Sequence, residues 1–229
     1  MTETLVVEDP AGECARRLAA AASAGSQIAL TGGSTPRIAY EQLAAMDVDW
    51  PGATLWFGDE RCVPPDDELS NYGMAKEALL DRLTEPGPRV ERMRGETGPH
   101  AGADDYEREM RTTLGEGTPR LDLVLLGLGS DGHVASLFPN APALEVQDRL
   151  VVGVEEAGLE PYVPRISLTL PVINAARSVV FLVSGGGKAE AVARAFGGGE
   201  GTAEVPASLV RPHSGELTLL LDEAAAGGL

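Results

Sequence analysis

The chain has 229 residues, and its 35 acidic side chains exceed its 18 lysine and arginine side chains, so the formal net charge is -17. This acidity argues against nucleic acid as a partner, because a phosphate backbone requires a basic face. No apolar run is as long as a membrane span and no leader segment precedes the first strand, so we expect one cytoplasmic domain, residues 1–229, without a membrane partner.

Short apolar runs alternate with helix-forming segments along the sequence. Strands that alternate with helices favour an α/β fold of Rossmann-like type, an open, mostly parallel sheet with helices on both faces. In chain order the prediction is a strand at 4–7, a helix at 11–24, a strand at 27–31, a helix at 37–45, a strand at 53–57, helices at 71–83 and 103–114, strands at 121–126, 150–154, 165–170 and 178–183, a helix at 188–196 and a strand at 216–221.

The strand at 27–31 runs into a glycine-rich turn, GGSTP at 32–36. Glycines expose backbone N–H groups, Ser34 or Thr35 can cap the helix that follows, and Pro36 suits its first turn. The turn is therefore suited to an anion. It is neither a phosphate-binding loop with the GxxxxGK[ST] lysine nor a GxGxxG dinucleotide loop, and an ordinary capped turn is the alternative.

A charged triplet, Asp59, Glu60 and Arg61, follows the strand at 53–57. Arg61 can stabilise an oxyanion or hold a phosphate, with Asp59 or Glu60 orienting it. A solvated loop is the alternative reading. Cys62 is a weak candidate nucleophile, because no histidine is locally paired with it as a base.

Asp131 and His133 lie in the glycine-rich turn that follows the predicted strand at 121–126. Open α/β sheets bind ligands outside the carboxyl ends of their strands. A neutral imidazole accepts a proton near neutral pH, so His133 is the candidate general base; a structural loop histidine is the alternative. His100 and His213 lack this setting, and we expect His213 in a surface loop.

The strand at 178–183 leads through Ser184 and three glycines to Lys188, at the start of a predicted helix. We expect a second contact to an anion there, because the N-terminus of a helix attracts negative charge; an ordinary surface lysine is the alternative. Four strand ends thus carry glycine and a polar cluster, and they should converge at one edge of the sheet. An acidic chain that binds an anion must concentrate its few cations, which makes Arg61, Arg165 and Lys188 notable.

Several of these segments together resemble the 6-phosphogluconolactonase family, in order and over most of the chain. The resemblance implies the fold of glucosamine-6-phosphate deaminase, hydrolysis of 6-phosphogluconolactone to 6-phosphogluconate in the oxidative pentose phosphate pathway, and no metal or organic cofactor. The partner is then a small phosphorylated sugar lactone. The segments are GGSTP (32–36), GDERCVP (58–64), SNYGMAKEALL (70–80), GLGSDGHVASLFP (127–139), PRISLTLPVINAA (164–176) and SGGGKAEAV (184–192).

For this chemistry His133 would deprotonate the water that attacks the lactone carbonyl and return the proton to the ring oxygen. Asp131 would orient the imidazole, although Asp59 is an open alternative for that support. Arg61 is the candidate for oxyanion stabilisation, with backbone N–H groups as the rival assignment. The expected substrate-binding residues, with the phosphate against the glycine loop and Lys188, are Gly32, Gly33, Ser34, Asp59, Arg165 and Lys188.

Two other functions are considered. A sugar-phosphate isomerase or deaminase would share the fold, but the deaminases place a glutamate five residues after the histidine, where this chain has Phe138. They also tend to carry an Asp-Glu-Tyr type triplet where this chain has Asp59, Glu60 and Arg61, and both departures favour the lactonase. A non-catalytic sugar-phosphate sensor would bind without turnover; regulators of this type carry a DNA-binding segment, for which we expect no room beside the first and last strands. A monomer is the preferred oligomeric state.

Overall fold

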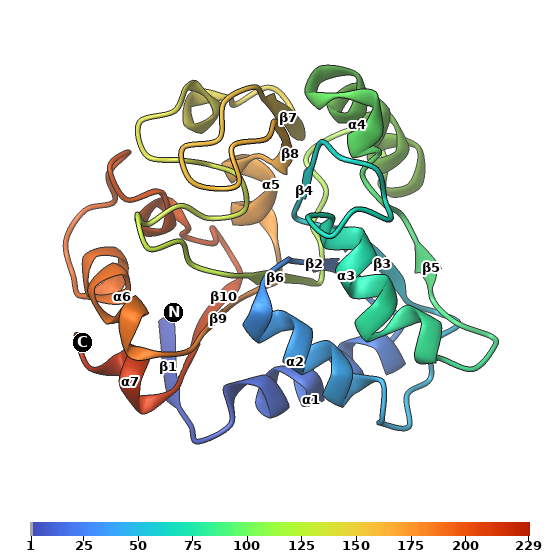
Figure 1. Ribbon diagram of the computed structural model, residues 1–229, viewed down its shortest axis with the longest axis horizontal. Helices are drawn as coiled ribbons and strands as arrows, with labels where there is room; N and C mark the ends of the chain where they lie inside the picture. Colours follow the sequence, from blue (N-terminus) through green and yellow to red (C-terminus); the bar gives the residue numbers. More distant parts are fainter. Residues whose placement is uncertain (1) are drawn as a thin grey trace.

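The computed structural model describes residues 2–229, which are built around a seven-stranded sheet (Figure 1). All neighbouring strands in this sheet are parallel. From β2 the chain moves outward through β3 to β5, and from β6 it moves the other way through β9 to β10, so the strand order reverses between β2 and β6. The strands in spatial order are β1 (Thr2–Val6), β10 (Glu216–Leu221), β9 (Ser178–Val183), β6 (Leu123–Leu126), β2 (Gln27–Leu30), β3 (Thr54–Phe57) and β5 (Arg89–Val90).

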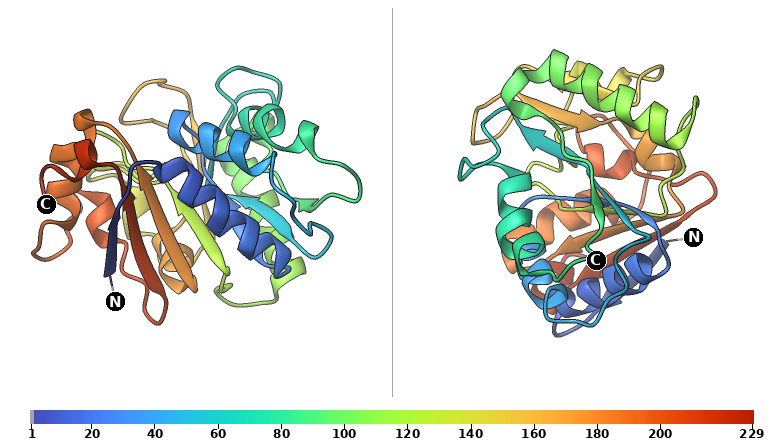
Figure 2. Two further views of the ribbon diagram at one scale, coloured as in Figure 1. Left: turned by 90° about the horizontal axis from the view of Figure 1, so that it is seen from below. Right: turned by 90° about the vertical axis from the view of Figure 1, so that its right-hand side faces the viewer.

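Different layers cover the two faces of this sheet (Figures 1 and 2). Helices α1 (Pro10–Ser23) and α2 (Ser34–Leu43) pack together on one face, where α1 contacts β2, β9 and β10. On the other face lies a three-stranded antiparallel sheet, against which α4 (Pro99–Leu114) packs. Its strands in spatial order are β4 (Asp59–Arg61), β8 (Arg165–Leu168) and β7 (Val151–Val154).

The remaining helices are short. Helix α3 contacts α2 and β4, and α7 contacts α6 and β10. No helix within residues 2–229 combines the length and the apolarity needed to cross a membrane. Their bounds are α3 (Asn71–Ala78), α5 (Leu170–Ala175), α6 (Ala189–Phe196) and α7 (Glu223–Ala226), with single 3-10 turns η1 (Leu80–Arg82), η2 (Gly95–Thr97), η3 (Pro142–Glu145), η4 (Gly186–Lys188) and η5 (Pro206–Leu209).

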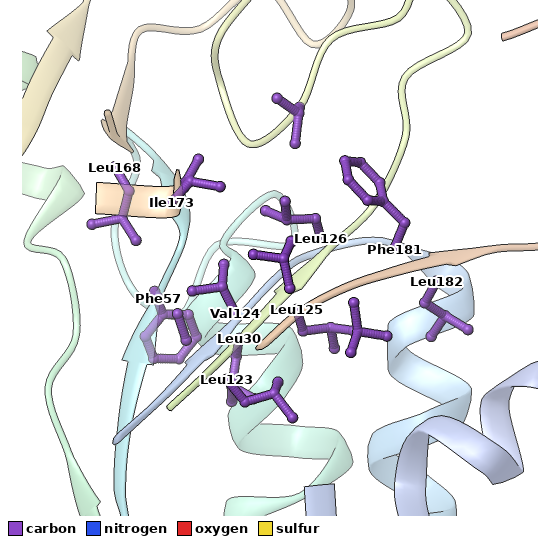
Figure 3. Packing of buried hydrophobic residues seen from close by; sticks show 14 of the residues in the cluster. Leu30, Phe57, Leu123, Val124, Leu125, Leu126, Leu168, Ile173, Phe181 and Leu182 are labelled. Carbon is purple, nitrogen blue, oxygen red and sulfur yellow. The ribbon is translucent and has the colours of Figure 1, made fainter. Parts of the chain in front are cut away.

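The core follows from strands that are covered on both faces. All four residues of β6 are buried, and their side chains alternate between the two layers (Figure 3). A strand that meets helices on one side and a second layer on the other needs apolar residues at every position, which explains the uninterrupted run Leu123–Leu126. Leu168 of β8 and Ile173 of α5 pack on the side of the second layer.

The parallel sheet confirms the predicted fold class, but the segments 150–154 and 165–170 do not join it. They form β7 and β8 of the antiparallel sheet, together with β4, which the sequence predicted as a charged loop. Only three residues form β4, and their pairing with β8 determines their conformation more than their own β propensity does. The predicted strand at 165–170 also ends early, because α5 begins at Leu170 with Pro171 in its first turn.

Candidate active site

Residues from widely separated segments line one cavity of about 220 Å³ at the carboxyl ends of β2, β6 and β9. The reversal of strand order between β2 and β6 opens a crevice there, as expected for an open α/β sheet. Asp131 is not part of the cavity wall, and it contacts His133 beside it. The residues predicted from the sequence that line the cavity are Gly32, Gly33, Ser34, Asp59, Arg61, His133, Arg165 and Lys188.

The loop after β6 holds His133 against Asp131. The imidazole Nδ1 lies 2.6 Å from Asp131 Oδ1, and the backbone N–H of His133 donates to the same oxygen at 3.0 Å. Burial acts to raise the pKa of Asp131, but the hydrogen bonds from His133 outweigh it and the pKa is lowered. The ionised carboxylate can only accept, so Nδ1 donates and the neutral ring presents Nε2 as its acceptor. A Cβ at Gly129 would lie 2.0 Å from Nδ1, so this loop position requires glycine.

Asp59 does not contact the histidine. Its buried carboxylate accepts from the Ser136 hydroxyl at 2.7 Å and from Asn71 Nδ2 at 3.2 Å. The sequence left open whether Asp59 or Asp131 supports His133. In the structure the aspartate that contacts the imidazole is Asp131. Asn71 was not among the predicted residues, although it lies in the SNYGMAKEALL segment. A Cβ at Gly32 would lie 1.9 Å from Asn71 Oδ1, so the amide and the glycine loop are in direct contact.

The side chain of Glu60 accepts hydrogen bonds at the start of helix α3 and does not orient an arginine side chain. Its buried carboxylate accepts the backbone N–H groups of Arg61, Asn71 and Tyr72 at 2.7 to 2.8 Å, and the Ser70 hydroxyl at 3.0 Å. Burial raises the pKa of this carboxyl despite these hydrogen bonds. The carboxylate thus fixes the start of α3 to the strand that carries Arg61.

Arg61 is left without a carboxylate partner. Its Nη1 donates to the backbone oxygen of Leu69 at 2.7 Å, and no ion pair within residues 2–229 includes its guanidinium. The expectation that Asp59 or Glu60 orients this guanidinium is therefore wrong. The reason is geometric, because both carboxylates are already occupied by α3 and its neighbouring turn. Arg61 keeps an unneutralised charge beside the cavity.

A second arginine stands opposite the first. Arg165 of β8 is the register partner of Arg61 of β4, and only 4% of it is exposed. Its Nε and Nη2 donate to the backbone oxygens of Val163 and Pro161, at 3.0 and 2.7 Å. Burial, followed by the positive charge of Arg61, lowers the pKa of Arg165. Two guanidinium groups that lack an ion-pair partner within residues 2–229 thus line the cavity.

The glycine loop and Lys188 complete the cationic surroundings. Helix α2 begins at Ser34, with Gly33 at the N-cap position at a φ of 111°, and no side chain caps it. The expectation that Ser34 or Thr35 caps the helix is wrong, and the N–H groups of its first turn stay available to an anion. Lys188 Nζ donates to the backbone oxygen of Leu128 at 2.7 Å. Burial lowers the pKa of Lys188, and the charge of Asp131 acts in the opposite direction.

Other candidates lie outside this constellation. Burial, followed by the charge of Glu60, raises the pKa of Cys62 to about 11, so its thiol stays protonated at neutral pH. His100 pairs with Glu155 at 2.9 Å on the surface, and neither it nor His213 lines the cavity. Leu159, from the segment between β7 and β8, lines the cavity without any signal in the sequence. Within residues 2–229, no group of three or more His, Cys, Asp or Glu side chains is arranged for a metal.

Comparison with known proteins gives the same picture along the whole chain. The family model for glucosamine-6-phosphate isomerases/6-phosphogluconolactonase matches residues 2–219. A 6-phosphogluconolactonase from Nostoc sp. is 42% identical over 207 residues, which cover 88% of this chain and 84% of that protein. The crystal structure of 6-phosphogluconolactonase from Leishmania guyanensis matches with a TM-score of 0.85 and 32% identity, covering 100% of this chain and 99% of the other.

A more distant likeness concerns the fold alone. A monomeric glucosamine-6-phosphate deaminase matches with a TM-score of 0.82 at 21% identity, and the match covers 100% of this chain and 99% of that structure. This confirms that the sheet and its surrounding layers are shared with the deaminases, as the motifs predicted. The chain therefore belongs to the glucosamine-6-phosphate isomerase/6-phosphogluconolactonase family.

Proposed function

We propose that this chain is a cytoplasmic 6-phosphogluconolactonase, which hydrolyses 6-phosphogluconolactone to 6-phosphogluconate in the oxidative pentose phosphate pathway. Relatives of that name match over most of the chain. The observation that carries the proposal is the imidazole of His133, held by Asp131 at Nδ1 and presented to a cavity lined by Arg61, Arg165 and Lys188. A base beside three cations suits water attack on an anionic substrate.

His133 acts first as a base and then as an acid. Its Nε2 takes a proton from water, and the resulting hydroxide adds to the lactone carbonyl carbon. The tetrahedral intermediate collapses with cleavage of the bond to the ring oxygen, and the imidazolium returns the proton to that oxygen. Asp131 stabilises the imidazolium between the two steps. Proton transfer of this kind contributes on the order of 100- to 10,000-fold in rate.

The substrate's charges are assigned to two parts of the cavity. Arg61 is placed at the developing oxyanion, because its guanidinium has no carboxylate partner to neutralise it. The phosphate is placed against the first turn of α2, at Gly32, Gly33 and Ser34, with Lys188 as its cation. Arg165 is a further phosphate contact through the donors that its loop does not use.

The position five residues after His133 bears on the choice between hydrolysis and deamination. Phe138 occupies it, and its ring centroid lies 4.8 Å from that of the imidazole. No carboxylate reaches the histidine from that side, whereas the deaminase reading requires one there. This contact favours the lactonase over a sugar-phosphate isomerase or deaminase.

The test compares wild type with His133→Ala on freshly generated 6-phosphogluconolactone, with the spontaneous rate subtracted. We expect His133→Ala to lose at least about 100-fold in kcat, because the base is removed. His213→Ala is the matched control, since His213 lies outside the cavity, and it should retain full activity. Non-phosphorylated gluconolactone should be the poorer substrate. Wild-type activity in His133→Ala, or no hydrolysis by wild type, would refute the proposal.

A further inference from the structure

The imidazole of His133 is confined on more than one side. Asp131 holds Nδ1, and Gly129 packs so closely that a Cβ there would lie 2.4 Å from the imidazole Cε1. The ring of Phe138 packs beside the imidazole, with the two planes tilted by 46°. The hydrogen bond at Nδ1 constrains one edge of the ring, and packing against the other ring atoms adds a second constraint. The position of Nε2 therefore also depends on the neighbour that the rest of the ring touches.

Phe138 is itself fixed from the other side. It is 3% exposed, and Gly158 packs against it so closely that a Cβ at Gly158 would lie 3.1 Å from Cβ and 3.2 Å from Cγ and Cδ1 of Phe138. Gly158 precedes Leu159, which lines the cavity. Imidazole, phenyl ring and glycine thus pack in sequence, and the glycine belongs to the segment between β7 and β8 that contributes Leu159 to the cavity wall.

On the function proposed above, we infer that Phe138 is a positioning residue for the reaction, which fixes the plane of the His133 imidazole so that Nε2 points to the attacking water. Phe138 is not among the residues that line the cavity, so it acts only through the histidine. An apolar ring suits this position, because it fixes the imidazole by packing and does not compete with Asp131 for its protons. The expected signature is a loss in kcat with little change in KM, since the substrate-binding groups lie elsewhere in the cavity.

The test replaces the ring and keeps an apolar side chain. Phe138→Leu should lower kcat about tenfold with KM within about twofold, because a small misplacement of a base is costly. Phe181→Leu is the matched control: Phe181 is fully buried and packs edge-on against Phe196, 5.0 Å away, without contact to His133. It removes a buried aromatic pair of the same kind and should leave kcat unchanged. Equal losses of kcat in both variants, or none in Phe138→Leu, would overturn the inference.

A spectroscopic measurement on the wild type needs no stable variant. The chain has only three histidines, and only His133 has an aromatic neighbour within the described residues. The imidazole proton shifts of His133 should therefore be displaced by the phenyl ring relative to those of His100 and His213. Shifts for His133 that match the other two histidines would overturn the inference even in an active enzyme, whereas absence of hydrolysis by wild type would overturn the proposed function and this role together.

Discussion

Lys188 shows how the surroundings of one side chain set the pH range of binding. Burial lowers the pKa of Lys188, whereas contact with Asp81 raises the pKa of Lys76, the only other lysine of the chain. A lysine loses its charge as pH rises through its pKa, so Lys188 loses its charge at lower pH than an exposed lysine does. Lys188, the cation proposed for the phosphate, therefore loses its charge at lower pH than Lys76 does.

We predict that Lys188→Met weakens binding of 6-phosphogluconate about tenfold near neutral pH, because one charge-assisted contact is lost. Wild-type affinity should fall toward the variant's value as pH rises, and the variant should lack that part of the pH dependence. Titration calorimetry between neutral and alkaline pH measures both effects. Lys76→Met is the control and should bind as wild type does. Equal affinity of Lys188→Met and wild type at neutral pH would remove Lys188 from the phosphate site.

At this scale the sequence predicted which residues come together better than it predicted their contacts. His133, Arg61 and Lys188 line one cavity because each follows a strand and a glycine-containing turn, and the topology brings such points together. Leu159 was missed, since an apolar residue in an irregular segment carries no pattern. The partners of Arg61 were predicted wrongly because neighbours in sequence were assumed to be neighbours in space. Along β4 successive side chains point to opposite faces, which separates Glu60 from the Arg61 guanidinium.

At the scale of elements, Glu107 joins helix α4 to the antiparallel sheet. Its carboxylate accepts from Arg111 on the same helix and from Arg149, at 2.7 and 2.8 Å, and from the backbone N–H groups that open β7. Burial acts to raise the pKa of Glu107, but hydrogen bonds from Arg149 and Arg111 outweigh it and the pKa is lowered. The carboxylate therefore contributes stability above the ordinary glutamate pKa of 4.5, and this contribution is lost as pH falls below it.

We predict that Glu107→Gln lowers the free energy of unfolding by about 2 kcal/mol at neutral pH, because several donors lose their charged acceptor. Urea unfolding of wild type and variant measures the difference, which should shrink as the pH falls below the ordinary glutamate pKa of 4.5 and through the lowered pKa of the folded protein. Glu109→Gln on the same helix is the control; Glu109 is only partly buried and pairs with the exposed side chain of Arg89, so its loss should stay below about 0.5 kcal/mol. Equal losses in the two variants would contradict the role given to Glu107.

The elements that the sequence predicted are those whose signal is local. The apolar runs of β2, β6 and β9 can be recognised in the sequence, because strands buried on both faces contain no polar residue in their centres. The antiparallel sheet depends instead on the pairing of β4 with β8, which lies far along the chain. Its strands at 150–154 and 165–170 were recognised, but no local pattern states which sheet a strand joins.

For the whole molecule, the order of the sheet predicts where the fold opens first. Strands β9, β6 and β2 are flanked on both sides, whereas β1 pairs only with β10 and exposes most of its residues. We predict that backbone amides of β1 exchange with deuterium at least about tenfold faster than those of β6, because edge strands open without global unfolding. Native-state hydrogen exchange measures this. Equal protection of β1 and β6 would contradict this prediction.

The pairing of Arg61 with Arg165 across the second sheet has a consequence for the stability of the protein with and without ligand. Like charges directly opposite each other weaken a pair of strands, and here the two guanidinium groups share one wall. On the function proposed above, an anionic ligand bound against this wall reduces the repulsion and adds its binding free energy to the stability of the fold. The protein without ligand is therefore the form that unfolds more easily.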